Sequence, residues 1–464
     1  MCETAGLTVM ERQQTGMMYR TKRFATGLCV AVLLVGLAVP AVAQTTLDRN
    51  TVRDLALEFN REFLQAQQEV VIADADVRRA RADAFPQINF AASYNRNFVV
   101  PSVFFVVNGE TQELQTGFRN SYGAQVSLSQ TLWQGGKVFT AIEIAKRYKR
   151  YSEAIANQVR AEVLYQAEQL YYDAILARSQ LSVWEQALES NTANLEVVRQ
   201  KYEQGIVPEY ELLRARVERQ NILPEIISAE SRVRLTEKRL KSFLGIDLSE
   251  PVEIVESATD TSLAALPALP VLIDSAQAHR PEKTQAEELV DISREGVSVA
   301  KAEYWPSFEA VAAWDWQSAS DDFTLSENNT SSWTAGLRVS LPIFDGFRRG
   351  SDVQMRKAQL SQARLSLKQT RDEVTLEVED AYDRLLRAKK AVDIQDATIA
   401  AATEGLEIAK LRYESGVGTQ LEVLSAQTAL TEARRVKAEA LFAFRVARAG
   451  LERATTLDIR TDMQ

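Results

Sequence analysis

Two long stretches without proline constrain the fold of this chain more than any other feature. Residues 137–204 contain neither proline nor glycine, and residues 348–414 contain only Gly350 and Gly405 as helix-weakening positions. At ~1.5 Å per residue, a helix of about 67 residues is roughly 100 Å long, about three times the hydrocarbon thickness of a bilayer. A compact globular domain does not need such a helix. The sequence therefore predicts two very long helices.

Both stretches carry apolar or aromatic residues at intervals of seven. This spacing is typical of helices that pack against one another in a coiled coil. The alternative, a cytoskeletal rod, does not account for the strands predicted below. The two series are Leu181, Leu188, Leu195 and Tyr202 in the first stretch, and Val392, Ile399, Leu406 and Tyr413 in the second.

The chain contains the same plan twice. The phrase "KYEQGIVPEYELL" (201–213) returns as "RYESGVGTQLEVL" (412–424), 211 residues later. Upstream, "FPQINFAASY" (85–94) returns as "WPSFEAVAAW" (305–314), 220 residues later. A repeat of roughly 200 residues is too long for a solenoid unit, so the sequence predicts two structural repeats.

Each repeat also contains two segments in which apolar and polar residues alternate. Tyr122, Ala124, Val126 and Leu128 share one face of the first of these segments. A period of two indicates strands with one apolar face, and aromatic residues near the strand ends are typical of membrane barrels. A soluble hairpin packed on helices is the alternative. The polar segments 101–117 and 318–332 are expected to be surface loops.

The predicted organisation is an α+β membrane protein with four strands per chain. Four strands cannot close a barrel, so the barrel must be shared between subunits, either two or three. The expected segments are a signal peptide over 1–43, with 1–17 upstream of a better start codon; a first repeat over 44–250, with a leading helix in 47–84, strands 87–100 and 118–133 and helices 137–204 and 208–244; a linker over 251–273; and a second repeat over 274–464, with strands 307–317 and 332–344 and helices 348–414 and 419–455.

The N-terminal segment predicts export. A basic stretch (18–23) precedes an apolar run (28–39) and a small-x-small site (41–43), which is the pattern of a cleaved signal peptide. Both cysteines, Cys2 and Cys29, fall in this segment. The exported chain is therefore expected to have no disulfide and no cysteine-based site.

The residues for enzyme chemistry are missing from the sequence. His279 is the only histidine, and a single histidine without cysteine partners does not make a transition-metal site. The chain has no phosphate-binding loop and no nucleophile–base set, and its net charge of −9 does not favour nucleic acid. The sequence therefore predicts a non-enzyme without cofactor, metal or nucleic-acid partner.

These features together resemble one known family. The doubled phrase, the strand-to-helix turns "LWQGG" (132–136) and "PIFDGF" (342–347), and the "RPE" (280–282) that opens the second repeat are similar to the outer membrane efflux protein (TolC) family. The resemblance covers about residues 46–455. It implies a homotrimer with a shared twelve-stranded β-barrel, continued by a long α-helical coiled-coil tunnel in the periplasm. It also implies a periplasmic adaptor protein and an inner-membrane pump or ABC exporter as partners.

The resemblance also assigns a role to the doubled phrase. In the family this phrase lies at the periplasmic helix tips, where the channel is closed. It implies that Tyr202, Gly205 and Glu211, with their counterparts, form a gate. Glycines can end helices with positive φ, and acidic residues around an opening favour cations. The counterparts in the second repeat are Tyr413, Gly416 and Glu422.

The chain departs from the family pattern at two positions of this gate. Gly418 stands where the family has an arginine, and Ser425 stands at its second acidic position. Arg214 is the candidate for a replacement cation. The alternative interpretation is that Glu211 and Glu422 have only a structural role, as acidic residues favoured at helix N-termini by the helix dipole.

Three functions fit the sequence. The first is the exit duct of a tripartite efflux system that passively conducts small toxic molecules from the periplasm to the exterior. The second is the outer membrane duct of a type I protein-secretion system, which neighbouring genes would distinguish. The third is a structural, envelope-spanning coiled-coil protein, which would show no conductance.

Overall fold

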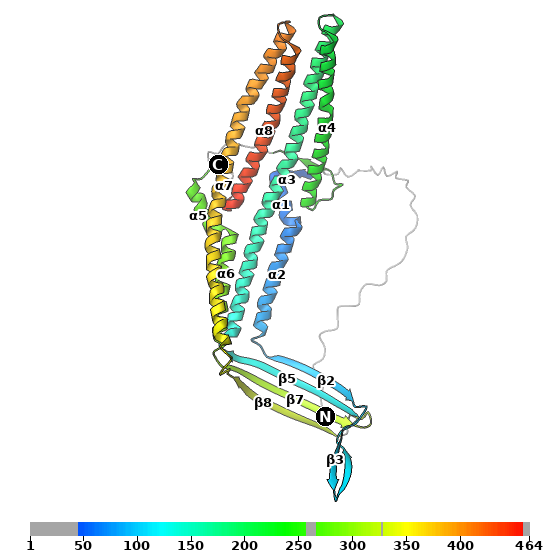
Figure 1. Ribbon diagram of the computed structural model, residues 1–464, viewed down its shortest axis with the longest axis vertical. Coiled ribbons are helices and arrows are strands. Elements are labelled where there is room, and N and C mark those ends of the chain that lie inside the picture. Colours follow the sequence, from blue (N-terminus) through cyan, green and yellow to red (C-terminus); the bar gives the residue numbers. More distant parts are fainter. Residues whose placement is uncertain (1–44, 257–265, 326–327, 458–464) are drawn as a thin grey trace, which may run out of the picture. The chain divides into compact units, whose positions relative to one another are not determined.

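The computed structural model describes residues 45–256, 266–325 and 328–457 (Figure 1). The expected signal peptide and the middle of the expected linker lie outside these residues. Within them, each repeat consists of two short helices, two strands of a common sheet and two longer helices. The first repeat contains α1 (Arg49–Phe59), α2 (Arg61–Ala82), β2 (Gln87–Arg96), β5 (Asn120–Gln134), α3 (Lys137–Glu203) and α4 (Glu209–Phe243); the second contains α5 (Leu269–His279), α6 (Pro281–Ala302), β7 (Ser307–Ser320), β8 (Asn329–Ser340), α7 (Arg348–Glu414) and α8 (Gln420–Thr455).

The bounds of these elements repeat with the two spacings found in the sequence. The helices α5 and α6 begin and end 220 residues after α1 and α2, and α7 begins and ends 211 residues after α3. Both long helices contain 67 residues. None of the described helices is both long and apolar enough to span a membrane.

The four longer strands form one antiparallel sheet in the order β2-β5-β7-β8. Gln87 pairs with Ser129 in the first repeat, and Ser307 pairs with Ser340 in the second, so both hairpins have the same register at the spacings of 220 and 211. The central pair β5·β7 joins the two repeats, and it contains a bulge between Thr131 and Trp133. Strands β2 and β8 are the two edges of this sheet.

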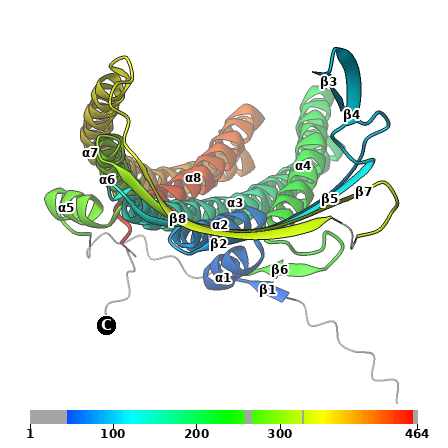
Figure 2. The ribbon, with the colours of Figure 1, turned by 90° about the horizontal axis from the view of Figure 1, so that it is seen from below.

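The helices follow the same order. Near the sheet, α2 packs on α3, α3 on α6 and α6 on α7; farther away, α4 packs on α3, α3 on α8 and α8 on α7. Figure 2 shows α7 and α4 on opposite flanks of this arrangement. Both near the sheet and farther away, α3 is the helix of the first repeat that contacts the second repeat. Helix α7 is an outer helix at both levels.

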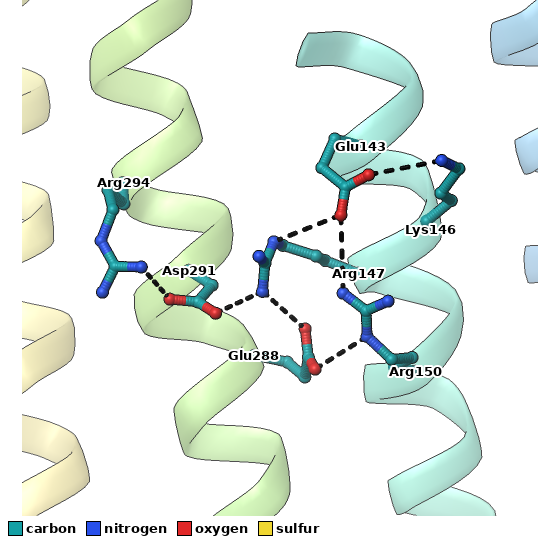
Figure 3. Close-up of polar contacts among 7 residues, drawn as sticks. All are labelled: Glu143, Lys146, Arg147, Arg150, Glu288, Asp291 and Arg294. Atoms are coloured by element: carbon teal, nitrogen blue, oxygen red, sulfur yellow. Dashed lines mark hydrogen bonds and ion pairs between the residues drawn. The ribbon is translucent and has the colours of Figure 1, made fainter. Parts of the chain in front are cut away.

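A cluster of charged residues joins the two repeats where α3 meets α6 (Figure 3). Arg147 of α3 is ion-paired with Asp291 of α6, and Arg150 Nε donates a hydrogen bond to Glu288 Oε1 at 2.9 Å. Lys137, at the start of α3, pairs with Glu303 just beyond α6 at 3.1 Å. Charged residues therefore contribute to this part of the junction, beside buried apolar residues of α6 such as Val290 and Val297.

The apolar core is divided among three clusters instead of one. One lies in the first repeat around Tyr171 and Leu240, and a second lies in the second repeat around Leu385 and Phe444. The third lies near the helix tips and contains residues of both repeats, including Val198 and Tyr413. Because the helices are long and the bundle is thin, each cluster contains only residues that lie at a similar height along the helices.

The segment 101–117 lies at the surface as expected, but the prediction of a loop is wrong because the segment contains a hairpin. Strands β3 (Ser102–Val107) and β4 (Glu110–Gln115) pair in antiparallel fashion around Asn108-Gly109. Both turn residues have positive φ, +53° and +90°, as a two-residue hairpin turn requires. The Asn-Gly dipeptide was the signal in the sequence.

The single leading helix over 47–84 is also wrong, because Asn60 divides it into α1 and α2. The Asn60 side chain accepts hydrogen bonds from the backbone N–H groups of Glu62 and Phe63, so it caps the second helix. Arg280 occupies the same place between α5 and α6, followed by Pro281. An asparagine cap and a proline at the first helical position each favour a new helix start.

Some strand ends differ from the expected ones. Strand β2 ends at Arg96 rather than at residue 100, and β8 runs from Asn329 to Ser340 rather than from 332 to 344. Pro342 lacks the N–H group that a strand needs, which explains the early end of β8. Two short parallel strands, β1 (Thr45–Leu47) and β6 (Val252–Ile254), were not expected.

Candidate functional site: the helix tips

The doubled phrase forms the turns at the ends of the helices farthest from the sheet (Figure 1). Gly205 follows α3 with φ +72°, and Gly416 follows α7 with φ +79°. In the first turn, the Ile206 N–H donates to the Lys201 carbonyl at 2.9 Å; in the second, the Val417 N–H donates to the Arg412 carbonyl at 3.0 Å. This closes each helix in the manner that a left-handed glycine permits.

Tyr413 is the best-connected residue at the tips. Its side chain is 5% exposed, and its hydroxyl donates a hydrogen bond to Glu211 Oε2 of the other repeat at 3.2 Å. Lys201 Nζ donates to the Tyr413 carbonyl at 2.5 Å and lies 3.9 Å from the centre of its ring. The second-repeat tyrosine is therefore held from two sides by the first repeat.

Burial and the neighbouring Glu211 carboxylate keep the Tyr413 hydroxyl protonated. Burial, followed by the charge of Glu211 and the hydrogen bond to it, raises the pKa of Tyr413 to about 12. The hydroxyl remains a donor throughout the physiological range. The contact with Glu211 is consequently one between a neutral donor and a carboxylate, and at 3.2 Å it is longer than the strongest bonds of this kind.

The equivalent residues, with the two repeats exchanged, are arranged differently. Tyr202 is 39% exposed, and Glu422 pairs with Arg412 of its own hairpin at 3.3 Å rather than with a tyrosine. Thr419 caps α8 by accepting a hydrogen bond from the Glu422 N–H at 3.3 Å. The four expected residues Tyr413, Glu211, Tyr202 and Glu422 thus lie at the tips, but only the first two touch each other.

Gly418 has a steric reason to be glycine. Its N–H donates to the Arg412 carbonyl at 2.8 Å, and a Cβ atom there would lie 2.8 Å from Arg412 Cβ and 3.0 Å from its carbonyl carbon. An arginine at this position requires the turn to shift. Ser425, the second departure from the family pattern, is exposed on α8.

The cations at the tips are not the one considered from the sequence. Among the described residues, no ion pair involves Arg214; Lys201 and Arg412 supply the positive charges instead. Lys201 and Arg412 each directly precede the tyrosine of the doubled phrase, so the sequence did contain a pattern that pointed to them. Whether such a basic residue contacts a tyrosine depends on which helix lies opposite.

The arrangement of strands and helices is that of solved outer membrane channels. The chain matches a CusC structure with a TM-score of 0.73 at 21% identity, covering 88% of this chain and 91% of that one. It matches VceC from Vibrio cholerae with a TM-score of 0.72 at 18% identity, covering 88% and 95%. These likenesses define the class of fold.

The sequence comparisons then place the chain within that class. Outer membrane protein OprJ of Pseudomonas aeruginosa is 26% identical over 396 residues, or 81% of this chain and 76% of OprJ. Outer membrane efflux protein BepC of Brucella suis is 24% identical over 87% of this chain and 84% of BepC. The model of the outer membrane efflux protein family matches residues 52–246 and 272–456, one segment in each repeat, and the chain belongs to this family. It is an outer membrane protein that extends into the periplasm.

Proposed function

We propose that this protein is the outer membrane exit duct of a tripartite efflux system, which passively conducts small toxic molecules from the periplasm to the exterior. Three chains would share a barrel of twelve strands and a tunnel of helices. One observation carries the proposal. In this member of the family, a four-stranded sheet with two edge strands leads directly into two helices of 67 residues each. Neither part is closed within one chain.

The names of related proteins support a role in efflux. CusC of Escherichia coli, 22% identical over 382 residues, is called a cation efflux system protein, and BepC is called an outer membrane efflux protein. An exit duct requires a periplasmic adaptor and an inner-membrane pump, because the sequence contains no phosphate-binding loop with which to drive transport itself. The function therefore requires no catalytic residue in this chain.

The helix tips are the proposed gate of the duct. Tyr413, held by Lys201 and Glu211, ties the second repeat to the first at the end of the helices. Such ties restrict the separation of the helix pairs, and releasing them would widen the opening. Three copies each of Glu211 and Glu422 around that opening would create a negative potential that favours cations.

Single-channel recording on the purified protein in a planar bilayer tests this function. We expect a small, cation-selective conductance for the wild-type protein, since the tips are closed by the tyrosine contacts. Deletion of the gene is expected to lower the minimal inhibitory concentration of several unrelated toxic compounds. A protein that conducts nothing, even with the tip contacts removed, would support a structural role instead.

A further inference from the structure

A cavity along the middle of α3 lies apart from the helix tips and from the edges of the sheet. Its volume is about 580 Å³, which falls in the range of ~300–1,000 Å³ that small-molecule sites occupy. Residues of α1, α3, α6 and α8 line it, together with His279 at the end of α5. Along α3 the lining runs from Arg150 to Glu168, a distance of about 27 Å at ~1.5 Å per residue. The cavity therefore lies between the two repeats of one chain.

Two of the helices that border the cavity lie on the outside of the curved chain. Figure 2 shows α1 and α5 on the convex side of the sheet. Arg53 of α1 and His279 of α5 line the cavity from these helices. In the proposed duct the concave side encloses the tunnel, so the rim formed by α1 and α5 borders the periplasm. A ligand of this cavity would therefore be a periplasmic molecule rather than one in transit through the tunnel.

The carboxylates that line the cavity are matched by cations. Figure 3 shows one of these pairs, in which Arg150 Nε donates a hydrogen bond to Glu288 Oε1. Four glutamates line the cavity, and each lies beside a cationic side chain; the pairs are Glu153 with Lys149 at 3.9 Å, Glu168 with Arg53 at 2.7 Å, Glu288 with Arg150 at 2.9 Å and Glu452 with Arg49 at 2.6 Å. The negative charges of the lining are therefore compensated within the chain.

Arg160 differs from the other arginines of the cavity. Arg53 and Arg150 are paired with glutamates of the lining. Arg453 pairs with Glu162 of α3 at 2.7 Å. The Arg160 side chain is exposed, and it has no ion pair or hydrogen bond with any of the residues that the structure describes. One positive charge of the lining is thus left for a ligand.

The second repeat shows which partner Arg160 lacks. The residue equivalent to Arg160, 211 positions later, is Arg371 of α7, which pairs with Glu287 of α6 at 3.2 Å. The residue equivalent to Glu287, 220 positions earlier on α2, is Gln67. A glutamine side chain carries no charge. The first repeat therefore contains the arginine of this pair without its carboxylate.

Uncharged hydrogen-bond donors belong to the same lining. Asn157 lies about one turn before Arg160 on α3, and Thr284 lies near the start of α6. Pro281, the first residue of α6, also lines the cavity, and no side chain among the described residues caps this helix. Amide and hydroxyl groups donate hydrogen bonds to oxyanions, and the positive end of a helix dipole favours a negative charge. These groups together with Arg160 favour an anionic ligand.

We propose that this cavity binds a small molecule with a carboxylate or phosphate group, and that Arg160 is the charged anchor of that group. A guanidinium binds either oxyanion through two parallel hydrogen bonds. Asn157 and Thr284 donate to the same group, and His279 adds a donor in its protonated form. The proposal goes beyond the duct, which requires no bound ligand, and every residue of the site belongs to one chain. A bound anion ties α3 to α6 and so stabilises the contact between the repeats.

The binding of two simple anions tests the site. The protein is purified in detergent and titrated calorimetrically with citrate, as the carboxylate probe, or with inorganic phosphate. Sodium chloride at equal ionic strength gives the baseline. We expect saturable binding of at least one of the two probes. The Arg160→Gln variant should bind that probe roughly tenfold more weakly, because it loses a charge-assisted hydrogen bond.

The matched control is Arg371→Gln, which removes the equivalent arginine of the second repeat, where a carboxylate is already the partner. This variant should bind the probes as tightly as the wild-type protein. Binding of citrate but not of phosphate would assign a carboxylate ligand to the site, and the opposite result would assign a phosphate ligand. The proposal is wrong if neither anion binds more tightly than chloride, or if Arg160→Gln binds as tightly as the wild-type protein.

Chemical modification tests the same residue in the unaltered protein. Phenylglyoxal reacts with accessible arginine side chains, and mass spectrometry of the digested protein gives the extent of reaction at each arginine. A saturating concentration of the bound probe should slow the modification of Arg160 several-fold. The modification of Arg371, which is also exposed, should not change. If Arg160 reacts equally fast with and without the anion, the anion binds elsewhere and the assignment of the site is overturned.

Discussion

The two helix tips share a sequence pattern but have different surroundings. Both have a basic residue, a tyrosine and a turn glycine in the same order, yet Tyr413 is buried against the other repeat and Tyr202 is partly exposed to solvent. The difference does not come from the turn itself. It lies in what each tyrosine contacts: Tyr413 meets Lys201 and Glu211 of the first repeat, whereas Tyr202 is 39% exposed.

The turns also differ in how tightly they are packed. The second tip has Gly418 where the first has Val207, and Thr419 where the first has Pro208. Gly418 donates to the same Arg412 carbonyl that accepts from Val417, which leaves no space for a side chain. The same turn motif therefore occurs in two settings. At one tip its tyrosine contacts the other repeat within the chain, and at the other tip its tyrosine is partly exposed.

The largest effect is expected from removing the acidic residues of both tips. Glu211→Gln together with Glu422→Gln would take six charges from the opening of the proposed trimer, and cation selectivity depends on such rings of charge. We expect the preference for potassium over chloride in planar bilayers to fall several-fold. The two single variants distinguish the contributions of the two tips. Because Glu211 also accepts a hydrogen bond from Tyr413, Glu211→Gln is expected to raise the conductance of the closed state, whereas Glu422→Gln is not. Unaltered ion selectivity in the double variant would contradict the proposed acidic opening.

The next largest effect is expected at Gly418. The Gly418→Ala variant places a Cβ atom 2.8 Å from Arg412 Cβ, and overpacking of this kind costs about 1–3 kcal/mol. We expect a lower thermal unfolding midpoint and greater leakage of antibiotics into cells. Val207→Ala is the matched change in the first tip and should have the smaller effect, because it adds no atom. Equal effects at the two tips would show that the packing difference between the turns is unimportant.

Loss of the tyrosine hydroxyls should have a moderate effect that differs between the tips. Tyr413→Phe removes the hydrogen bond to Glu211, a loss of about 1–2 kcal/mol per chain, and should raise the conductance of the closed channel. Tyr202→Phe is the control for a contact inside the chain. It should alter the conductance only if a second copy supplies its partner. A Tyr413→Phe channel as tightly closed as the wild-type would remove this residue from the gate.

The smallest effect is expected from alkaline pH. The pKa of Tyr413 is raised to about 12, above the usual tyrosine value near 10, so the folded tip holds its proton more firmly than the unfolded chain. The stability from this proton is complete below about pH 10 and is lost as the pH rises towards 12. We expect closed-state conductance to rise over this interval in the wild-type and to rise less in Tyr413→Phe. Identical pH profiles would assign the transition to other groups.

Much of the fold could be read from local sequence patterns. The absence of proline in 137–204 and 348–414 predicted two long helices, and the alternation of apolar and polar residues around Val126 predicted a strand. The hairpin at Asn108 does not follow from the composition of its segment, which is polar like that of a loop; only the Asn-Gly dipeptide indicates the turn. The break at Asn60 was missed because a capping residue can be judged only once the helix beyond it is known.

The candidate site was predicted in part. Sequence and resemblance together named Tyr413 and Glu211, which the fold brings to within 3.2 Å of each other. They did not name Lys201 or Arg412, and they suggested Arg214 as the cation. A basic residue on an exposed helix is usual, so only the position of the opposite helix distinguishes one that contacts a tyrosine from one that faces solvent.

The sequence by itself determined the repeats, the long helices, the left-handed turns at Gly205 and Gly416, and the family of the protein. These depend on interactions within a few turns of helix or strand, or on patterns repeated along the chain. The tertiary structure decided which of two equivalent tyrosines is buried, which cation meets it, and why Gly418 excludes a side chain. The first two depend on contacts between residues some two hundred positions apart, and local sequence does not specify which helix lies opposite. The third depends on the path of the backbone within one turn, where Gly418 lies against Arg412.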